Sequence, residues 1–563
     1  MNALAALVRA YDRLHQNGLV ASFGFAEQRI GFVVYLDGHG NPVGSPVDYQ
    51  GQGALEKPAT MLVPRPAKRT FGIAPNFLWD KASYVLGVSS DGASRAHLEH
   101  ESFVEYHRRK LRDTSDEGLL AFQEFLRRWR PEMFDELRWP ERMRDKNIAF
   151  ALISETGEYS FLHQRIASKS LWEEILGGVE CASGPCLITG RRSTLERVHP
   201  VVKGVMGAQS SGASVVSFNL EAFASHGRRQ GENAPISDQA AFAYTTALNY
   251  FLARNSAHRI QIGDTTVVFW SSSASKPEGM AHEALFAQLF GRDERSDKLD
   301  PTKLVKAIEA HSRHSQVDNA PRFHILGLSA NAARLSVRFY CETDFGSLIG
   351  KYGEHLQRLE IAPGARNLFP SVWRLLIEAV PDRKSTSILP KLAAEVFMAI
   401  VVDAPYPRNF LHAILRQMRS ADDVNMVRAG ILKAALMRNF AQNIAISLDE
   451  GRLSLPYLLG RLYACYQGQE RAALDQAGPI ARRFGMCLIQ PKNGFTAVAR
   501  AANRYDASDR LSRRIEGVRA LIATQAAVVP VHFGICQQAD FTIGFVHQRF
   551  ALDDQRAQSA PKP

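Results

Sequence analysis

The chain has 563 residues, which is enough for two to four domains that each bury a core. Its 68 Lys and Arg outnumber its 57 Asp and Glu, so the formal net charge is +11, which favours a nucleic-acid partner. The six cysteines are scattered, which argues against a disulfide framework and indicates a reduced protein. No run approaches 18 apolar residues and no signal peptide is recognisable, so the sequence predicts a cytoplasmic protein without a membrane span.

The predicted elements of the N-terminal part alternate between helices and short strands. In chain order they are a first amphipathic helix, strands at 31–36 and 61–63, a highly charged helical region at 101–146, a strand at 147–154, a short helix at 171–176, a strand at 215–218 and a helix capped by Ser237. A mixed α and β architecture follows for this part.

The loop that precedes 215–218 has the composition of a polyanion-binding loop. Gly204, Gly207 and Gly212 permit backbone conformations that a Cβ would exclude, and they let N–H groups approach an anion. Short side chains that both donate and accept hydrogen bonds lie between them, and two arginines follow in a second loop before Ser237. A tight structural turn without a ligand remains the alternative.

Catalysis is not expected at this loop. Gly207 and Gly212 have Walker spacing, but Ala213 and Ser214 follow, so the phosphate-binding lysine is missing. No G-x-S-x-G elbow and no pair of metal-binding carboxylates lies nearby. Cys181 and Cys186 lack the second Cys/His pair that structural zinc requires, so neither a metal nor another cofactor is predicted.

A second candidate loop lies near 64–77, where two prolines exclude a central strand. Lys68 and Arg69 are placed for phosphate contacts, and Asn76 beside Phe77 combines an amide with an aromatic ring. Amides read base edges and aromatic rings stack on bases. The alternative is that Phe77 belongs to the core and Asn76 caps a helix.

The remainder of the chain changes character near Gly346. Before this point we expect a strand at 265–270, helices at 281–290 and 303–311, and a hairpin formed by 322–328 and 333–340. After it the apolar residues recur with a helical period and strand signals vanish. The predicted fold class is therefore α+β, with a mixed region 1–345, which may subdivide near 100–150, and a helical region 346–563.

The surplus positive charge is concentrated in the last quarter of the chain. From Met426 to the end there are 18 Lys and Arg against 10 Asp and Glu. Arginines on a helical bundle can follow a phosphate backbone without sequence preference, although a merely solvated surface is the alternative. The candidates for this contact are Arg482, Arg483, Arg510, Arg513 and Arg514.

Several stretches together resemble one known family. They are GVMGAQSSGASVVSFN at 204–219, QGENAPISDQAAFAYTTALNY at 230–250, and the segments 68–80, 326–331 with Arg334, and 541–548. This pattern is similar to that of the large subunit of the type I-C CRISPR Cascade surveillance complex, a CRISPR-associated protein of the Csd family. The resemblance extends over essentially the whole chain.

The resemblance implies a non-catalytic subunit of a crRNA-guided DNA surveillance complex. Its N-terminal part would recognise the protospacer-adjacent motif in double-stranded DNA and help to open the duplex for R-loop formation, while guide pairing reads the sequence. Its helical part, from about Met426, resembles the small subunit that lines the displaced strand, and Met426 or Met437 are candidate internal starts. Implied partners are crRNA, target DNA, the backbone and crRNA-handle-binding subunits, the small subunit and a helicase-nuclease.

Within this framework the candidate residues fall into two groups. Phosphate contacts are assigned to Lys68, Arg69, Lys203, Arg228 and Arg229. Reading or wedging of the motif base pairs is assigned to Asn76, Phe77, Gln209, Ser210, Ser211 and Asn233. An architectural RNA-binding subunit without motif recognition is the main alternative, and an enzyme that uses the glycine-rich loop is the second.

Overall fold

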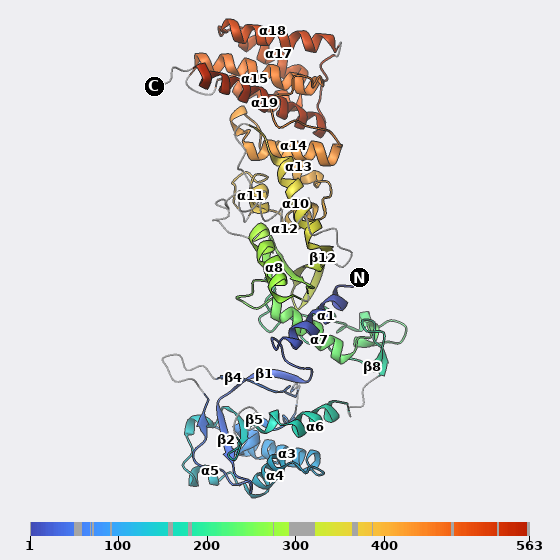
Figure 1. Cartoon of the computed structure of the whole chain (residues 1–563), viewed down its shortest axis with the longest axis vertical. Helices are drawn as coiled ribbons and strands as arrows, with labels where there is room; N and C mark the ends of the chain where they lie inside the picture. The colour runs from blue at the N-terminus through green and yellow to red at the C-terminus, as the bar shows by residue number, and fades with distance from the viewer. Residues whose placement is uncertain are drawn as a thin grey trace. The chain divides into compact units, whose positions relative to one another are not determined.

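The computed structural model describes residues 2–49, 59–67, 69, 72–90, 93–155, 161–177, 183–273, 275–291, 321–362, 370–384, 387–474, 478–525 and 528–559 (Figure 1). It forms two compact units. The N-terminal unit is Asn2–Pro200 with Val216–Tyr250, and the C-terminal unit is Val201–Val215 with Phe251–Pro563. Short sheets lie in the first part of the chain and helices in the last, so the predicted α+β class is confirmed.

The N-terminal unit contains short strands and mostly short helices. They are α1 (Ala3–Gln16), β1 (Phe25–Ile30), β2 (Phe32–Leu36), β3 (Val47–Asp48), β4 (Ala59–Pro64), β5 (Trp79–Lys81), α2 (Ala82–Val85), α3 (Ala93–Lys110), α4 (Glu117–Arg128), α5 (Met133–Glu136), β6 (Asn147–Leu152), α6 (Ile166–Gly177), β7 (Ser183–Pro185), β8 (Arg192–Thr194) and α7 (Asp238–Phe251), which ends at the boundary of the unit.

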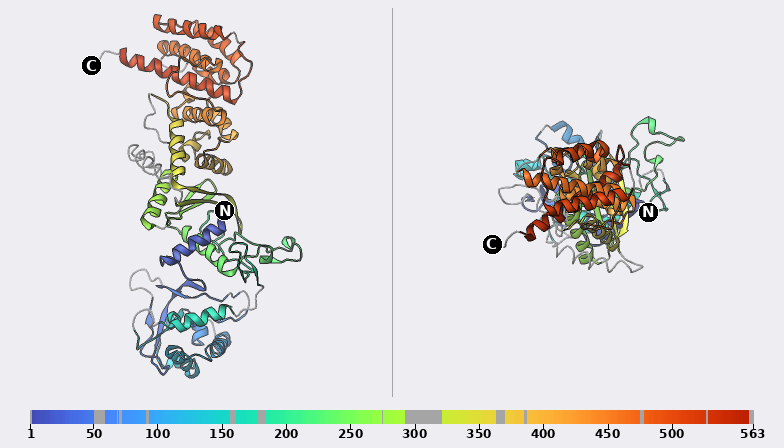
Figure 2. Two further views of the ribbon diagram at one scale, coloured as in Figure 1. Left: turned by 45° about the vertical axis from the view of Figure 1, so that its right-hand side comes forward. Right: turned by 90° about the horizontal axis from the view of Figure 1, so that it is seen from above.

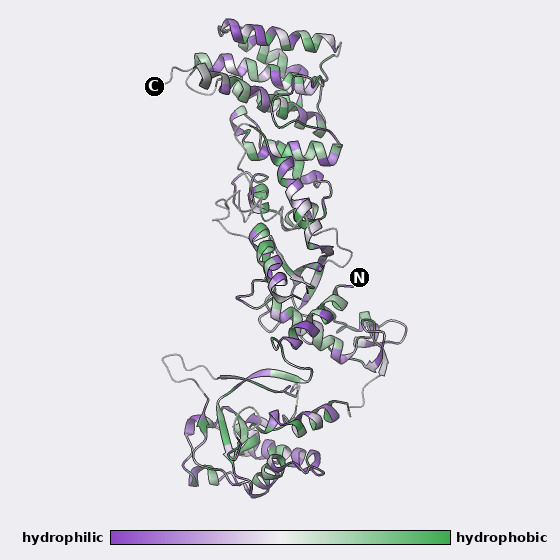
Figure 3. Ribbon diagram, viewed as in Figure 1, coloured by the Kyte–Doolittle hydropathy of each residue, from purple (hydrophilic) through white to green (hydrophobic). Residues whose placement is uncertain are grey.

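A sheet with the order β3-β2-β6-β5 forms the centre of this unit among the described residues. β2 and β6 run parallel, with Phe32 opposite Ile148 and Leu36 opposite Leu152, because α2 to α5 supply the crossover between them. Both strands are almost wholly buried and hydrophobic (Figure 3). Aromatic side chains from α3, α4 and β6 pack against this sheet and make the core.

The C-terminal unit begins with a sheet and continues as helices. Its elements are β9 (Arg259–Ile262), β10 (Thr265–Ser271), α8 (Lys276–Phe290), β11 (Arg322–Asn331), β12 (Arg334–Asp344), α10 (Phe345–Leu359), α11 (Val372–Ile377), α12 (Pro390–Val402), α13 (Arg408–Arg416), α14 (Met426–Phe440), α15 (Leu455–Ala473), α16 (Phe484–Ile489), α17 (Pro491–Ala502), α18 (Asp509–Thr524) and α19 (Ile535–Ser559).

The sheet of this unit has the antiparallel order β12-β11-β10-β9. Every residue of β10 is buried, so this central strand is covered on both faces. α8 contributes Phe286, whose ring centroid lies 4.6 Å from that of Phe269 and 5.1 Å from that of Phe323. One hydrophobic core then continues from these strands into the helices.

Helices α15 and α19 pack against one another within the C-terminal helical region, which is the orange and red part of the chain in Figure 2. A Cβ at Gly460 would lie 2.0 Å from the Phe541 carbonyl oxygen, and one at Gly544 would lie 2.1 Å from that of Tyr457. Only glycine permits such an approach of two backbones. The last helix is therefore fixed against α15.

The expected boundary at 345/346 marks the change from strands to helices but not the division into compact units. β9 to β12 share a core with the helices, so they belong to the same unit as α10 to α19. α14 begins at Met426, where a small-subunit-like bundle was expected, yet its Arg428 pairs with Glu378 and its Lys433 donates to the Arg358 carbonyl at 3.2 Å. α14 is thus tied to the elements that precede it.

Most expected elements are present, with one clear error. The predicted N-cap of α7 is confirmed, since the Ala240 N–H donates to Ser237 Oγ at 3.2 Å. The strand expected at 215–218 does not form, because Val215 and Val216 are only half-buried and the chain passes from one unit to the other between them. The helix expected at 303–311 lies outside the described residues.

Candidate nucleic-acid interface

The glycine loop, residues 203–212, is the end of a hairpin-like segment in the C-terminal unit. Val202 and Ala213 exchange backbone hydrogen bonds of 2.8 and 2.9 Å, and the Gly212 N–H donates to the Gln209 carbonyl at 2.9 Å. These bonds close the loop and direct its polar side chains outward. The exposed residues are Lys203, Gln209, Ser210 and Ser211.

This loop is fixed to the sheet beneath it. A Cβ at Gly204 would lie 2.5 Å from the Leu252 carbonyl oxygen, and Arg259 Nη1 donates to the carbonyls of Gly204 and Leu252 at 3.1 and 3.0 Å. The Met206 N–H donates to Thr266 Oγ1 at 3.1 Å. The glycines therefore serve the turn, as the structural alternative proposed, and the polar side chains of Gln209, Ser210 and Ser211 are exposed.

The turn between β11 and β12 lies beside the glycine loop. The Ser214 N–H donates to the Ala333 carbonyl at 3.0 Å, and the Leu335 N–H donates to the Ser214 carbonyl at 2.9 Å. Ala332 has a φ of 52°, a left-handed conformation that costs a residue with a Cβ about 1–2 kcal/mol. Backbone strain of this kind concentrates at functional sites.

Two residues of this turn extend the candidate surface. Asn331 is exposed and Arg334 is half-buried, and they add an amide and a guanidinium to the polar groups of the glycine loop. Sequence reasoning included both in the family resemblance but not in the site. The signal that could have found them is the short connection between two predicted strands, which places its residues at a sheet edge.

The arginine loop, residues 217–233, belongs to the N-terminal unit. Arg228 and Arg229 are exposed, as a phosphate-binding role requires. Asn233 is half-buried, and its Nδ2 donates to the carbonyls of Arg228 and Gln230 at 3.3 and 3.2 Å. The amide of Asn233 therefore holds the backbone of the loop, which leaves less of it for reading a base than predicted.

The basic loop, residues 65–77, differs from its prediction at three positions. Arg69 donates from Nε to the Ala74 carbonyl at 2.7 Å, pairs with the buried carboxylate of Asp80 and lies 4.0 Å from the Tyr84 ring centroid. Asn76 is only 4% exposed, and its Oδ1 accepts from the Ala67 N–H at 2.9 Å. Both side chains serve the fold, because each is bonded to groups of the protein itself.

Phe77 is a core residue, as the alternative reading proposed. Its ring is fully buried between Trp172 and His107, with centroid distances of 5.5 and 5.8 Å, so no face is free to stack on a base. Burial lowers the pKa of His107 to about 3, and its neutral Nε2 accepts from the Leu78 N–H at 2.9 Å. Lys68, the remaining candidate here, lies outside the described residues.

The candidate arginines of the last quarter divide into two groups. Arg483 is half-buried and donates to the Pro479 carbonyl at 2.7 Å, and Arg514 pairs with Glu450 at 2.9 Å. The other three side chains are exposed, and two of them follow one another by a helical turn on α18, where they share a face. These exposed residues are Arg482, Arg510 and Arg513.

The described residues contain no group of three or more His, Cys, Asp or Glu that could hold a metal ion. Cys186 is buried, and Cys181 lies outside the described residues. Burial opposes ionisation of the Cys186 thiol, but hydrogen bonds from Ser237 and Thr189 lower its pKa to about 7. In the part of the chain that the structure describes, no helix has the length and apolar character to cross a membrane.

These features define a basic protein with several exposed surfaces that combine cations and amides. A family model described as CRISPR-associated protein (Cas_Csd1) matches residues 7–552. The match spans nearly the whole chain, so the protein is CRISPR-associated, and it belongs to the Csd1 family. A comparison with curated proteins gave no match.

Proposed function

We propose that this chain is the non-catalytic large subunit of a type I-C crRNA-guided DNA surveillance complex. It recognises the protospacer-adjacent motif in double-stranded DNA, aids duplex opening and R-loop formation, and recruits a helicase-nuclease in antiviral defence. Its partners in this role are crRNA, the backbone and crRNA-handle-binding subunits and the small subunit. Membership of the Csd1 family supports the setting, and the exposed polar surfaces support contact with nucleic acid.

The observation that carries motif recognition is the exposed, fixed glycine loop. Gln209 carries an amide, which can donate to and accept from a base edge, and Ser210 and Ser211 can do either. Arg259 and Thr266 hold the backbone of the loop on the sheet, so this backbone loses little freedom when the loop binds a ligand. Asn331 from the neighbouring turn adds a second amide.

Phosphate contacts in this proposal come from exposed cations on both units. Lys203 lies at the glycine loop, Arg228 and Arg229 lie in the arginine loop, and Arg510 and Arg513 lie on α18. Such contacts carry no sequence information, but they fix the register of the duplex or follow a single strand. Arg69 and Phe77 have no part in this assignment because they are committed to the fold.

The test is gel-shift binding by the reconstituted guide-loaded complex, with and without this chain, to duplexes with a correct or a scrambled flanking motif. We expect a gain in affinity that needs both this chain and the correct motif. Equal binding to the two duplexes would instead favour the architectural RNA-binding role. Metal-dependent cleavage by the isolated chain would contradict a non-catalytic subunit.

A salt titration separates phosphate contacts from base contacts. Lys203→Ala should weaken binding to both duplexes and reduce the slope of log K against log salt by about 1. The matched control is Lys492→Ala, which removes an exposed lysine from α17. An unchanged slope in Lys203→Ala would remove this lysine from the interface.

A further inference from the structure

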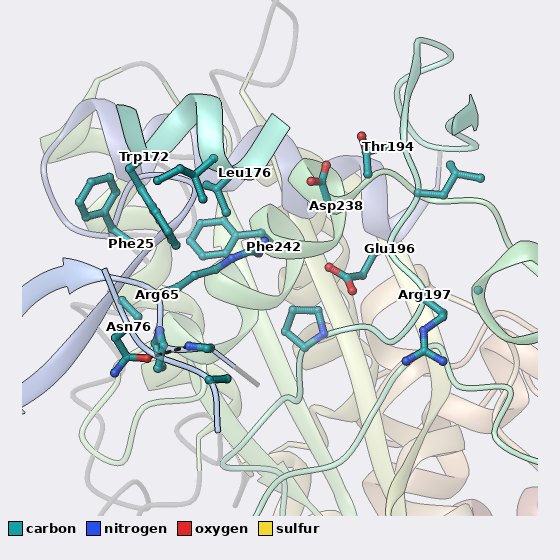
Figure 4. A pocket seen from close by; sticks show the side chains of 18 of the residues that line it. Phe25, Arg65, Asn76, Trp172, Leu176, Thr194, Glu196, Arg197, Asp238 and Phe242 are labelled. Atoms are coloured by element: carbon teal, nitrogen blue, oxygen red, sulfur yellow. Dashed lines mark hydrogen bonds between the residues drawn. The ribbon is translucent and has the colours of Figure 1, made fainter. Parts of the chain in front are cut away.

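A pocket of about 1180 Å³ lies within the N-terminal unit (Figure 4). One wall comes from β1, the start of the basic loop, α6 and Phe242 of α7, and the other comes from the segment after β8, the arginine loop and the start of α7. Pockets for small ligands are typically about 300–1,000 Å³, so this one has room for a ligand with attached groups. The residues assigned above to nucleic-acid contact leave it unused, apart from Arg229 and Asn76 at its lining.

The first wall is apolar and aromatic. Phe242 of α7 is half-buried, and the rings of Tyr11 and Phe23 meet it edge to face at centroid distances of 5.7 and 5.5 Å. Trp172, Phe25 and Leu176 lie near it in the same wall (Figure 4). Phe242 is thereby held in a fixed orientation at the pocket, and the π-face of a planar ligand gains from stacking on such a ring.

The second wall carries charges of both signs. Glu196 and Arg197 lie on a segment that is hydrogen-bonded to the residues just before α7. The Glu196 N–H donates to the Ile236 carbonyl at 2.9 Å. Gly231 packs under this segment so closely that a Cβ there would lie 2.2 Å from the Glu196 carbonyl oxygen. Arg197 Nη1 donates to Gln230 Oε1 at 2.9 Å, which fixes the arginine at the rim.

Arg65 and Asp238 connect the two walls. Arg65 Cζ lies 5.5 Å from the Phe23 ring centroid, and the Arg65 side chain extends toward Phe242 (Figure 4). Burial raises the pKa of Asp238, while the charge of Arg65 opposes that rise. A carboxylate and a guanidinium therefore lie beside the aromatic surface, where each can bond to the edge of a planar ligand.

This combination excludes a simple groove for a phosphate backbone. Three arginines line the pocket, but so do three carboxylates, Glu196, Glu232 and Asp238, which repel phosphate. Carboxylates accept hydrogen bonds from ring N–H and exocyclic amino groups, and guanidinium groups bond to base acceptors or to an attached phosphate. A nucleobase presents all of these groups on one flat ring.

We propose that the pocket accepts one unpaired nucleotide whose base carries an exocyclic amino group, from a nucleic-acid strand bound to this chain. The proposal rests on the proposed function in one respect, that the chain binds nucleic acid. The base stacks on Phe242, its amino group donates to Asp238, and Arg65 and Arg197 bond to base acceptors or to the adjoining phosphate. Unpaired bases are recognised in this manner, by stacking and by hydrogen bonds to their edges.

The experiment uses the full chain and an eight-nucleotide single strand of thymidines with one central 2-aminopurine. Stacking quenches 2-aminopurine fluorescence, so the emission reports entry into the pocket. We expect quenching on binding, and a loss of affinity of at least fivefold for Phe242→Leu and for Arg65→Met. The control Arg29→Met removes an exposed arginine of the same unit outside the pocket and should bind like the parent.

Competition tests the role of the amino group. An octamer with one central adenine should displace the probe better than all-thymidine DNA, and Asp238→Asn should reduce this preference. The RNA versions of both competitors show which kind of strand supplies the nucleotide. Equal competition by the thymidine octamer, or equal losses for Arg65→Met and Arg29→Met, would overturn the proposal.

The outcome is separable from that of the proposed function. Motif-dependent gel shifts with unchanged probe binding in the pocket variants would remove the pocket proposal and leave the large-subunit role in place. Quenching that depends on the pocket residues, without motif-dependent binding, would support the pocket proposal and remove motif recognition by this chain. A melting curve for each variant distinguishes loss of the nucleotide from loss of the folded N-terminal unit.

Discussion

The basic loop and the glycine loop have similar composition, but the polar side chains of the first bond within the protein and those of the second are exposed. Both combine cations, amides and conformationally permissive residues, and both were expected to contact nucleic acid. In the basic loop, Arg69 bonds to Asp80 of β5 and Asn76 bonds to Ala67 of the loop. In the glycine loop, Gln209 and Lys203 are exposed while backbone groups and Arg259 hold the loop.

The difference follows from the neighbours of each loop. Phe77, Leu78 and Trp79 are all buried, so the hydrophobic effect draws the end of the basic loop into the core. Its polar groups must then find partners inside the protein, since a buried polar group without a hydrogen bond is costly. The glycine loop contains no comparable aromatic run, and its side chains of Lys203, Gln209, Ser210 and Ser211 are exposed.

Among the substitutions that test the difference between the two loops, one at Asp80 is expected to have the largest effect. This buried carboxylate pairs with Arg69 and accepts from the N–H groups of Asn76 and Lys81 at 2.9 and 2.8 Å. Asp80→Ala removes the carboxylate from the partly exposed Arg69 and leaves two N–H donors without their acceptor, so the N-terminal unit should lose about 3–5 kcal/mol of stability. Urea unfolding measures this, and Asp113→Ala, at a residue 84% exposed, is the control expected within about 1 kcal/mol of the parent.

Acid should loosen the basic loop through His107. Its pKa is lowered by burial to about 3, below the value near 6.5 in the unfolded chain, so the folded state favours the neutral ring. The stabilisation is complete above about pH 6.5 and is lost as the pH falls toward 3, by about 1.4 kcal/mol per pH unit.

The measurement is the free energy of unfolding of the parent and of His107→Gln between pH 7 and 4.5. The variant is expected to be less stable at pH 7 but to decline less steeply as the pH falls. The exposed His39 provides the control, since His39→Gln should retain the slope of the parent. Parallel slopes for all three proteins would contradict a neutral buried His107.

Two amide deletions sharpen the comparison between the loops. Asn76→Ala leaves the half-buried Ala67 N–H without its acceptor and should destabilise the N-terminal unit by about 1–3 kcal/mol, with no selective effect on motif preference. Gln209→Ala should leave stability unchanged but reduce discrimination between motif and scrambled duplex by about 1–3 kcal/mol. Gln16→Ala, at an exposed position of α1, should change neither.

Melting curves and gel shifts of the reconstituted complex measure the two effects separately. A selective motif defect in Asn76→Ala with normal stability would restore this residue as a base reader. Parent-like discrimination in Gln209→Ala would remove the central residue of the proposed motif contact.

The fold class was readable because periodicity and apolar runs report burial directly. β2, β6, β10 and the β11–β12 hairpin coincide with apolar or alternating segments, and Ser237 caps α7 through ordinary local chemistry. The sequence could not show that Val215 and Val216 do not form a strand, because two apolar residues form one only where a neighbouring strand pairs with them. The division into units depended on packing between distant segments, which periodicity does not encode.

The candidate site was predictable in its exposed parts and not in its anchors. Gln209, Arg228 and Arg229 are exposed, as the contacts predicted for them require, and those contacts stay predictions. The sequence did not show that Asp80 would hold Arg69, because that bond joins residues brought together only by the packing of β5. The pocket beside Phe242 likewise combines several separate stretches of chain, and no spacing rule connects them.

The smallest expected effect concerns the strained turn beside the glycine loop. Ala332 has a φ of 52°, which glycine adopts without steric cost and alanine does not, so Ala332→Gly should relieve strain. Because glycine also has more freedom to lose on folding, the net gain should be no more than about 1 kcal/mol. The melting temperature of the C-terminal unit measures the change. The control is Ala333→Gly at the next residue, which has no positive φ, and this substitution should destabilise the C-terminal unit. If Ala332→Gly gains stability but weakens motif discrimination, the strain at this turn serves to position Asn331 and Arg334 beside Gln209. The glycine loop would then differ from the basic loop in its fixed geometry and not in its composition alone.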